Sequence, residues 1–197
     1  MHTSLENTGL APAEMLGSVN EFISKITELT QLIGLDLSAF QADHIALRIN
    51  DVEVAQLAHQ AWLSYGQQIS ATQINGRPII VIKFDQPLRA SSWQIECLEL
   101  PYPAAGKPYP RQGWEHVEFV IPSDAQSADG YLADVQQRFS GLKEVWPKLT
   151  QLGVKSKLSS PQGEGERLAN PTIAFKYQGV CIKLHPHALS TIIASEQ

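Results

Sequence analysis

The chain has 197 residues, which is enough for one well-packed domain or for two small fused modules that share a core. Hydrophobic residues make up 43% and charged residues 18%, as is usual for a globular protein, and the formal net charge is −5. This acidic balance, without any basic run interleaved with aromatic residues, argues against a nucleic-acid or membrane-surface partner.

Cysteine content and the N-terminal sequence bear on the compartment. Cys97 and Cys181 both lie in apolar, strand-like segments, and two cysteines do not form a disulfide framework in a chain of this size. We therefore expect buried reduced thiols and a cytoplasmic protein. No secretory signal is expected, and no run of about 18 apolar residues predicts a membrane span.

The first element expected along the chain is an amphipathic helix. Apolar residues recur at helical spacing from Pro12 to Ile33, with Pro12 suited to the first turn and Gly34 to the position just past the end. We expect residues 1–40 to form an N-terminal helical extension packed on the domain. The alternative is a helix that binds a partner protein.

Residues 41–104 are expected to form a first module of βαβββ order. A strand over 43–49 leads to an N-cap signal at Asn50-Asp51 and a helix over 52–65. Asn75-Gly76 predicts a hairpin between strands over 67–74 and 78–84, and a fourth strand covers 92–100. Residues 101–110, rich in proline, glycine and tyrosine, indicate a linker.

Residues 105–197 are expected to repeat this plan. The predicted elements are a strand over 115–121, a helix that ends near Phe139, an extra helical stretch over 143–152, and strands over 154–159, 171–177 and 180–185. Gln178-Gly179 predicts the last tight turn, and the polar loop over 160–170 is either solvated or lies over a cavity mouth. The fold predicted is α+β, with paired βαβββ modules that form a curled mixed sheet around a cavity, fused over 41–187.

The strongest functional signal is a repeated strand. Asp43-His44-Ile45-Ala46-Leu47-Arg48-Ile49 returns in outline as Glu115-His116-Val117-Glu118-Phe119-Val120-Ile121. Because side chains alternate along a strand, His44 shares a face with Arg48, and His116 shares a face with Glu118. If the modules pack as pseudo-twins, the two imidazoles converge on one cavity. Two histidines and a carboxylate suit a divalent metal, although a lone histidine on a strand is more often structural.

Other polar residues on these faces extend the candidate site. Glu99 ends an otherwise apolar stripe, and burying a lone carboxylate is costly unless it is paired or binds a metal, so we prefer Glu99 to Glu96 as the cavity acid. In the last strand, either His185 is a fourth ligand or Lys183 contributes a charge instead. Arg48 could clamp a substrate anion or form an internal ion pair with Glu99 or Glu118. Glu118 could act as a general base or a replacement ligand.

These strands carry a family resemblance. The segments Asp43-His44-Ile45-Ala46-Leu47-Arg48, Trp114-Glu115-His116-Val117-Glu118-Phe119 and Ile95-Glu96-Cys97-Leu98-Glu99-Leu100-Pro101 resemble the vicinal oxygen chelate superfamily over about residues 41–187. The whole chain, with its N-terminal helix, resembles the bacterial YecM family. The superfamily resemblance implies paired βαβββ modules around a metal cavity, as in glyoxalase I, methylmalonyl-CoA epimerase, extradiol dioxygenases and bleomycin-resistance proteins.

The resemblance also implies a ligand set. The first-strand histidines of the superfamily fall on His44 and His116, and the last-strand acid of the first module falls on Glu99. The corresponding glutamate of the second module falls on Lys183, which departs from the pattern and leaves three ligands unless His185 or Glu118 substitutes.

We therefore predict a divalent-metal-binding protein, an isomerase or oxidoreductase that acts on a small oxygenated anion, with iron, manganese, zinc or nickel as the metal. The predicted metal ligands are His44, Glu99, His116 and His185, with Glu118 transferring a proton and with Arg48 and Lys183 binding substrate. The alternative is a non-catalytic module that sequesters a small ligand in the same cavity. The expected partner is a small molecule, and the expected state is a monomer or a homodimer.

Overall fold

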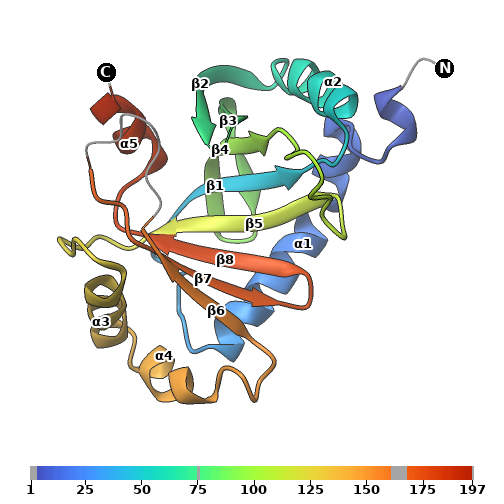
Figure 1. The fold of residues 1–197 in the computed structure, drawn as a ribbon. Helices are drawn as coiled ribbons and strands as arrows, with labels where there is room; N and C mark the ends of the chain where they lie inside the picture. Colours follow the sequence, from blue (N-terminus) through green and yellow to red (C-terminus); the bar gives the residue numbers. More distant parts are fainter. Residues whose placement is uncertain (1–3, 75, 161–167, 197) are drawn as a thin grey trace.

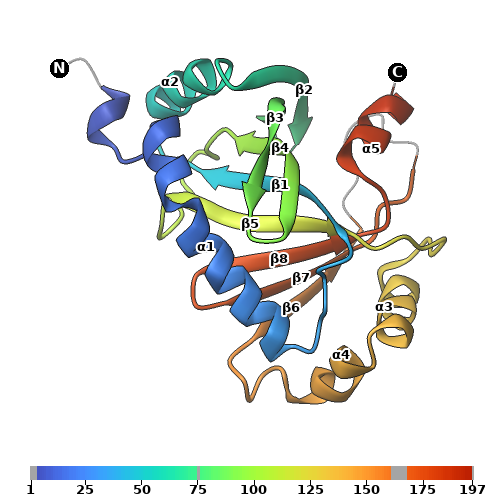
Figure 2. The ribbon, with the colours of Figure 1, turned by 180° about the vertical axis from the view of Figure 1, so that it is seen from behind.

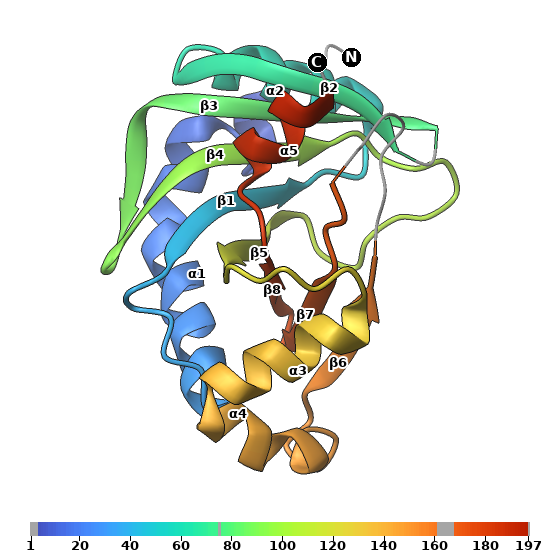
Figure 3. The ribbon, with the colours of Figure 1, turned by 90° about the vertical axis from the view of Figure 1, so that its left-hand side faces the viewer.

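One eight-stranded sheet organises the protein. The computed structural model describes residues 4–74, 76–160 and 168–196. The strand order is β2-β3-β4-β1-β5-β8-β7-β6 (Figure 1), and the sheet curls without closing (Figure 3). The pairs β1–β4 and β5–β8 are parallel and the other neighbouring pairs are antiparallel. The expected α+β fold with a curled mixed sheet is confirmed.

The sheet is built from two βαβββ units joined at its centre. The first contains β1 (Gln41–Arg48), α2 (Val52–Trp62), β2 (Gly66–Ile74), β3 (Arg77–Ala90) and β4 (Trp93–Pro101). The second contains β5 (Gly113–Val120), α3 (Ala128–Arg138), α4 (Ser140–Val145), η2 (Trp146–Lys148), β6 (Lys155–Ser159), β7 (Thr172–Tyr177) and β8 (Val180–His185). Short η1 (Leu5–Asn7), α1 (Pro12–Leu32) and α5 (Leu189–Glu196) flank the two units. Antiparallel pairing of β1 with β5 joins them.

Helix α1 lies across one face of this sheet (Figure 2). Its apolar stripe, which includes Ile23 and Ile26, belongs to one core cluster with Ile45 and Phe119 from the central strands. The indole Nε1 of Trp114 in β5 donates a hydrogen bond to the carbonyl of Met15 at 2.9 Å. The helix is therefore packed on its own sheet, and its apolar stripe is covered by that sheet.

The end of α1 explains why a glycine follows it. Gly34 has a φ of +71°, its N–H donates to the Gln31 carbonyl, and the N–H of Leu35 donates to the Thr30 carbonyl. This is the Schellman arrangement, which satisfies the last carbonyls of a helix. A Cβ at Gly34 would also lie 2.5 Å from the backbone of Gly141, so the position requires glycine for both backbone shape and space.

Strand alternation divides the sheet into two chemically different faces. Residues such as Ile45, Val117 and Ile182 lie in the apolar cluster with α1, whereas their neighbours His44 and His116 face the opposite side. The polar face lies inside the curl of the sheet, and its residues form the site described below.

Among the helices of the described residues, none has the length and apolar character needed to span a membrane.

Several elements differ from the sequence-based expectation. Strand β3 continues to Ala90, although Pro87 is a poor strand residue, because Leu88 to Ala90 pair with β4 beyond a register shift. Helix α5 was not predicted, and the extra stretch over 143–152 resolves into the end of α4 and η2. The predicted hairpin turn at Asn75 and residues 161–167 of the polar loop lie outside the described residues. The turn at Gln178-Gly179 is present, with positive φ at both residues.

The packing of α1 yields a stability prediction. Ile26 is fully buried in the core, so Ile26→Ala is expected to lower the free energy of unfolding by about 2–5 kcal/mol. Ser24→Ala on the exposed side of the same helix is the matched control and is expected to change it by less than about 0.5 kcal/mol. Urea titration measures both, and equal effects would show that α1 is not part of the core.

Candidate functional site

Two histidines meet where the two modules join. Ala46 of β1 lies opposite His116 of β5, and His44 lies opposite Glu118. The two imidazole centroids are 6.1 Å apart, and both rings are buried, with 2% and 0% of the residue exposed. The structure therefore places His44 and His116 on the same side of the sheet, facing one another, as the repeated strand predicts.

Two carboxylates complete a cluster around the rings. Ligand atoms of His44, Glu99, His116 and Glu118 all lie within 4.8 Å of one another. Nε2 of His44 is 3.6 Å from Glu99 and 3.3 Å from Glu118, and Nε2 of His116 is 3.9 Å and 3.1 Å from the same two carboxylates. Glu99 belongs to β4, where it pairs in register with Ala46 of β1. Three strands therefore contribute to the cluster.

The acid that precedes each histidine in the sequence contacts Nδ1, the ring nitrogen that faces away from the cluster carboxylates. Nδ1 of His44 lies 3.0 Å from Asp43, and Nδ1 of His116 hydrogen-bonds with Glu115. The pairing register shifts by one residue at both places: Asp43 is the extra residue between Ala42 and His44, and Glu115 is its counterpart in β5. These β-bulges turn each acid to the same side as its histidine. A carboxylate on Nδ1 fixes the ring and leaves Nε2 for a ligand.

Each of these acids is anchored a second time. The backbone N–H of Leu189, at the start of α5, donates to Asp43 at 2.9 Å. Arg48 pairs with Glu115 at 3.1 Å and lies 4.8 Å from the centre of the Tyr109 ring. The acid partner of Arg48 is thus Glu115, and not Glu99 or Glu118, the two acids considered from the sequence. Nε and Nη1 of Arg48 are buried without a hydrogen-bond partner in the described part of the chain.

Lys183 stands at the position that mirrors Glu99. Glu99 pairs in register with Ala46 next to His44, and Lys183 pairs with Glu118 next to His116. The Lys183 ammonium donates to Glu118 at 2.6 Å and lies 3.1 Å from Nε2 of His116. Because an ammonium has no lone pair, Glu118 and not Lys183 can supply a carboxylate-type donor atom beside His116.

His185 lies at the edge of the cluster. Its Nε2 is 3.7 Å from Asp43 and 3.8 Å from Glu118, and its ring centroid is 5.9 Å from that of His44. It groups with Asp43 and His44, not with the four residues above. Burial lowers the pKa of His185, so the ring is neutral at neutral pH, and neither nitrogen has a hydrogen-bond partner in the described residues.

Charge interactions outweigh burial at the central groups. Burial alone would lower the pKa of His44, but the charge of Glu118, the hydrogen bond with Asp43 and the closeness of Glu118 and Glu99 to Nε2 hold that pKa well above its usual value. Burial alone would raise the pKa of Glu99, but His44, Lys183 and His116 lower it to about 2. The pKa of Glu118 is likewise held well below its usual value, against burial, chiefly by Lys183 and His44. Both carboxylates are therefore ionised at neutral pH.

The residues present fit a divalent cation. Four carboxylates (Asp43, Glu99, Glu115 and Glu118) and two cationic side chains (Arg48 and Lys183) leave a formal charge of −2 once both histidines are deprotonated, as a metal ligand must be. Nε2 of His44 is buried, faces two carboxylates and makes no hydrogen bond. Imidazole nitrogens with carboxylate oxygens form a donor set that suits zinc, manganese or non-haem iron.

Asp43 and Glu115 are site residues that the sequence analysis did not assign. The available signal was the acid that precedes the histidine in both copies of the repeat. Strict alternation would send these acids to the opposite face, so only the two register shifts reveal their role.

Comparison with known proteins places this geometry in a family. The family model described as "YecM protein" matches residues 11–196. The chain is 35% identical to Protein YecM of Escherichia coli over 93% of both chains, and 34% identical to an uncharacterized protein of Haemophilus influenzae over 85% of this chain and 86% of that one. The solved structure of "Protein EC4020" is 31% identical and has a TM-score of 0.77, over 100% of this chain and 98% of that one.

The environment of the cysteines predicts inert thiols. Burial raises the pKa of Cys97 to about 11 and that of Cys181 to about 12, and both side chains are buried. A thiolate is the nucleophile, so neither is expected to react with iodoacetamide at pH 8 in the native protein, while both react within minutes in guanidinium. Mass spectrometry counts the labels. Rapid stoichiometric labelling of the native chain would contradict the burial and reopen cysteine chemistry.

Proposed function

This chain belongs to the YecM family, and from the cluster between its strands β1, β4 and β5 we propose that it is a divalent-metal-binding protein acting on a small oxygenated anion. The observation that carries the proposal is the convergence of two imidazoles and two carboxylates within 4.8 Å of one another. The reaction class proposed is an isomerase or oxidoreductase.

The proposed ligands are His44, Glu99, His116 and Glu118. The sequence predicts the first three, with His185 as the fourth. We propose Glu118 in its place, at the second-module position where Lys183 cannot act as a ligand, because an ammonium has no lone pair to donate. His185 is left beside the cluster, where its neutral ring faces His44 and Asp43. When bound, a metal with open positions would polarise a substrate oxygen or lower the pKa of bound water.

The remaining polar residues would bind and orient the substrate. Two guanidinium nitrogens of Arg48, Nε and Nη1, have no partner in the described residues and could donate hydrogen bonds to an anionic group of the substrate. Lys183 stays protonated because the charges of Glu118 and Glu99 raise its pKa against the effect of burial, so it adds a fixed positive charge. The low pKa of Glu118 favours a ligand role over that of a general base, which works best with a pKa near the operating pH.

Metal analysis tests the proposal. Protein purified without a histidine tag is expected to bind one Mn²⁺, Fe²⁺, Ni²⁺ or Zn²⁺ ion per chain and to melt at a higher temperature when it does. His44→Ala and His116→Ala each remove a proposed ligand. Mutating a residue that only hydrogen-bonds to a ligand lowers metal affinity by roughly 10- to 100-fold, so each of these variants should lose at least that much. Elemental analysis and isothermal titration calorimetry provide the measurements.

His59→Ala is the matched control for these variants. His59 is in α2, where its two ring nitrogens lie 3.1 Å from Tyr102 and 2.8 Å from Gln68, and it has no place in the cluster. Its variant should bind metal as the unmodified chain does. Substoichiometric metal, with an unchanged melting temperature for all four ions, would eliminate the metal-dependent function.

Lys183 favours a second candidate function, a metal-free module that sequesters a small anion. Its ammonium already neutralises Glu118 and occupies the lone pair of His116 that a metal would need. In that case the Lys183 ammonium takes the place of a metal cation in the cluster. The same cavity would then hold a ligand without catalysing a reaction.

Lys183→Met separates the two candidates. It removes a positive charge from beside the carboxylates and frees Nε2 of His116, so metal affinity should rise by about tenfold or more. Calorimetry with Mn²⁺ measures the change. A chain that binds Mn²⁺ only as the Lys183→Met variant supports the metal-free module, whereas tight binding by the unmodified chain supports the enzyme. Weaker binding by the variant would refute the competition between lysine and metal.

A further inference from the structure

A cavity of about 550 Å³ lies beside the histidine cluster, on the second module. Its lining includes Glu115, which holds His116, and Cys181, which pairs in register with His116. The cavity and the cluster therefore share a wall, and the cavity is large enough for part of a small-molecule ligand.

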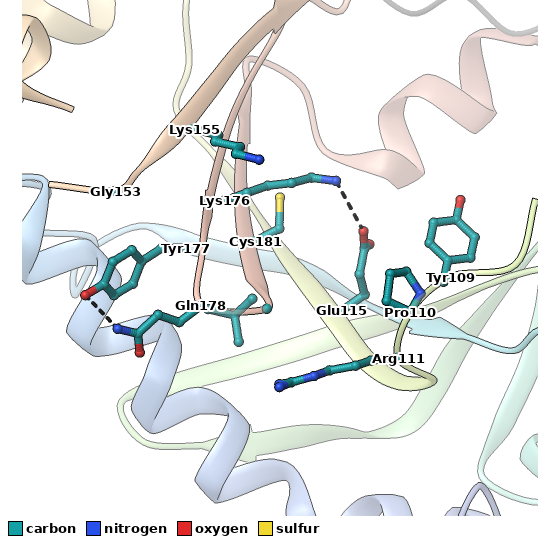
Figure 4. Close-up of a pocket in the computed structure, with 12 residues that line it drawn as sticks. Tyr109, Pro110, Arg111, Glu115, Gly153, Lys155, Lys176, Tyr177, Gln178 and Cys181 are labelled. Carbon is teal, nitrogen blue, oxygen red and sulfur yellow. Dashed lines mark hydrogen bonds and ion pairs between the residues drawn. The ribbon is translucent and has the colours of Figure 1, made fainter. Parts of the chain in front are cut away.

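The wall of this cavity is cationic. In register across the sheet, Cys181 of β8 is followed by Lys176 of β7 and Lys155 of β6, and both lysines line the cavity. Figure 4 shows Lys155 and Lys176 extending in the same direction, toward Glu115. The next rung carries Lys183, Ala174 and Lys157. One face of three adjacent strands thus presents four lysines in a chain whose net charge is −5.

The positive charge of this wall is poorly compensated. The Lys176 ammonium is 3.9 Å from Glu115, but Glu115 already pairs with His116 and Arg48. Lys155 forms no ion pair with an acid in the described part of the chain. Lysines that face a concave surface without partners concentrate a positive potential there and attract anions.

The first module presents a different wall. On its corresponding face, β3 carries Ile79 and Val81, and β2 carries Ser70 and Thr72. The cations of these two strands that share the face are Arg77 and Lys83. Positive charge on the inner surface is therefore unequal, with two cationic side chains on these outer strands and four on β6, β7 and β8. An elongated ligand would have its charged end toward the second module.

We propose that the cavity lined by Lys155 and Lys176 is a binding subsite for a multiply charged oxyanion, of the kind a phosphate ester carries. Lysine binds such groups as a point charge, and a monocarboxylate would leave the second lysine uncompensated. The inference deepens the proposed function, since the group bound here would belong to the molecule whose oxygens reach the histidine cluster. Cys181 and Glu115 line the cavity, and both are neighbours of His116, so the subsite adjoins the cluster.

Pyrophosphate binding to metal-free protein tests the subsite. The EDTA-treated chain, at about 0.15 M salt to screen diffuse charge, is expected to bind one pyrophosphate, and acetate should bind at least about tenfold more weakly. Lys155→Gln/Lys176→Gln should lose at least about tenfold in pyrophosphate affinity. Lys143→Gln/Lys148→Gln makes the same change in net charge on the exposed surface of α4 and η2 and should stay within about twofold of the unmodified chain.

The outcomes separate the subsite from the metal site. No pyrophosphate binding, acetate binding of equal strength, or equal losses in the two double variants would overturn the subsite. The Lys155→Gln/Lys176→Gln chain should still bind Mn²⁺ as the unmodified chain does, since neither lysine is in the cluster. Pyrophosphate binding in a chain that takes no metal would keep the subsite and reject the metal function, and the reverse result would reject the subsite alone.

Discussion

The antiparallel pairing of β1 with β5 is the constraint on which the rest of the structure depends. It joins the two modules, closes the core beneath α1 and brings His44 and His116 to one side. A slip of one residue in this register would exchange the polar and apolar faces of one strand. The buried positions of Ile45 and Val117, which face each other across the pair, hold the register because either shift would expose them. The apolar core therefore fixes the geometry of the polar site.

The two β-bulges are the second device that builds the site. They occur at equivalent places in the two strands, and each adds one acid to the inner face without moving the histidine off it. Asp43 and Glu115 then hold the two Nδ1 atoms, while the start of α5 and Arg48 hold the acids in turn. Buried carboxylates are costly when unpaired, and every carboxylate of this cluster has at least one cationic, imidazole or N–H partner.

Much of this arrangement follows from local sequence pattern, and the rest depends on tertiary contacts. Period-two alternation, the repeated acid-histidine segment and the stripe that ends in Glu99 suffice to predict both rings and one carboxylate. The partner of Arg48 could not be predicted, because Glu115 reaches it only through a bulge that alternation does not encode. The link from α5 to Asp43 joins residues 146 positions apart, and the extension of β3 past Pro87 depends on pairing with β4.

Among the differences between the modules, one pair of positions in the cluster gives the cavity its polarity. The first module has Ala46 and Glu99 where the second has Glu118 and Lys183. The second acid has moved one strand inward, so it still reaches both rings, and the vacated position holds a cation. Lys183 is also the innermost of the lysines on β6, β7 and β8. Divergence of the second copy thus keeps a carboxylate at the cluster and sets a positive wall beside it, which is the charge distribution that would orient an anion whose oxygens face the imidazoles.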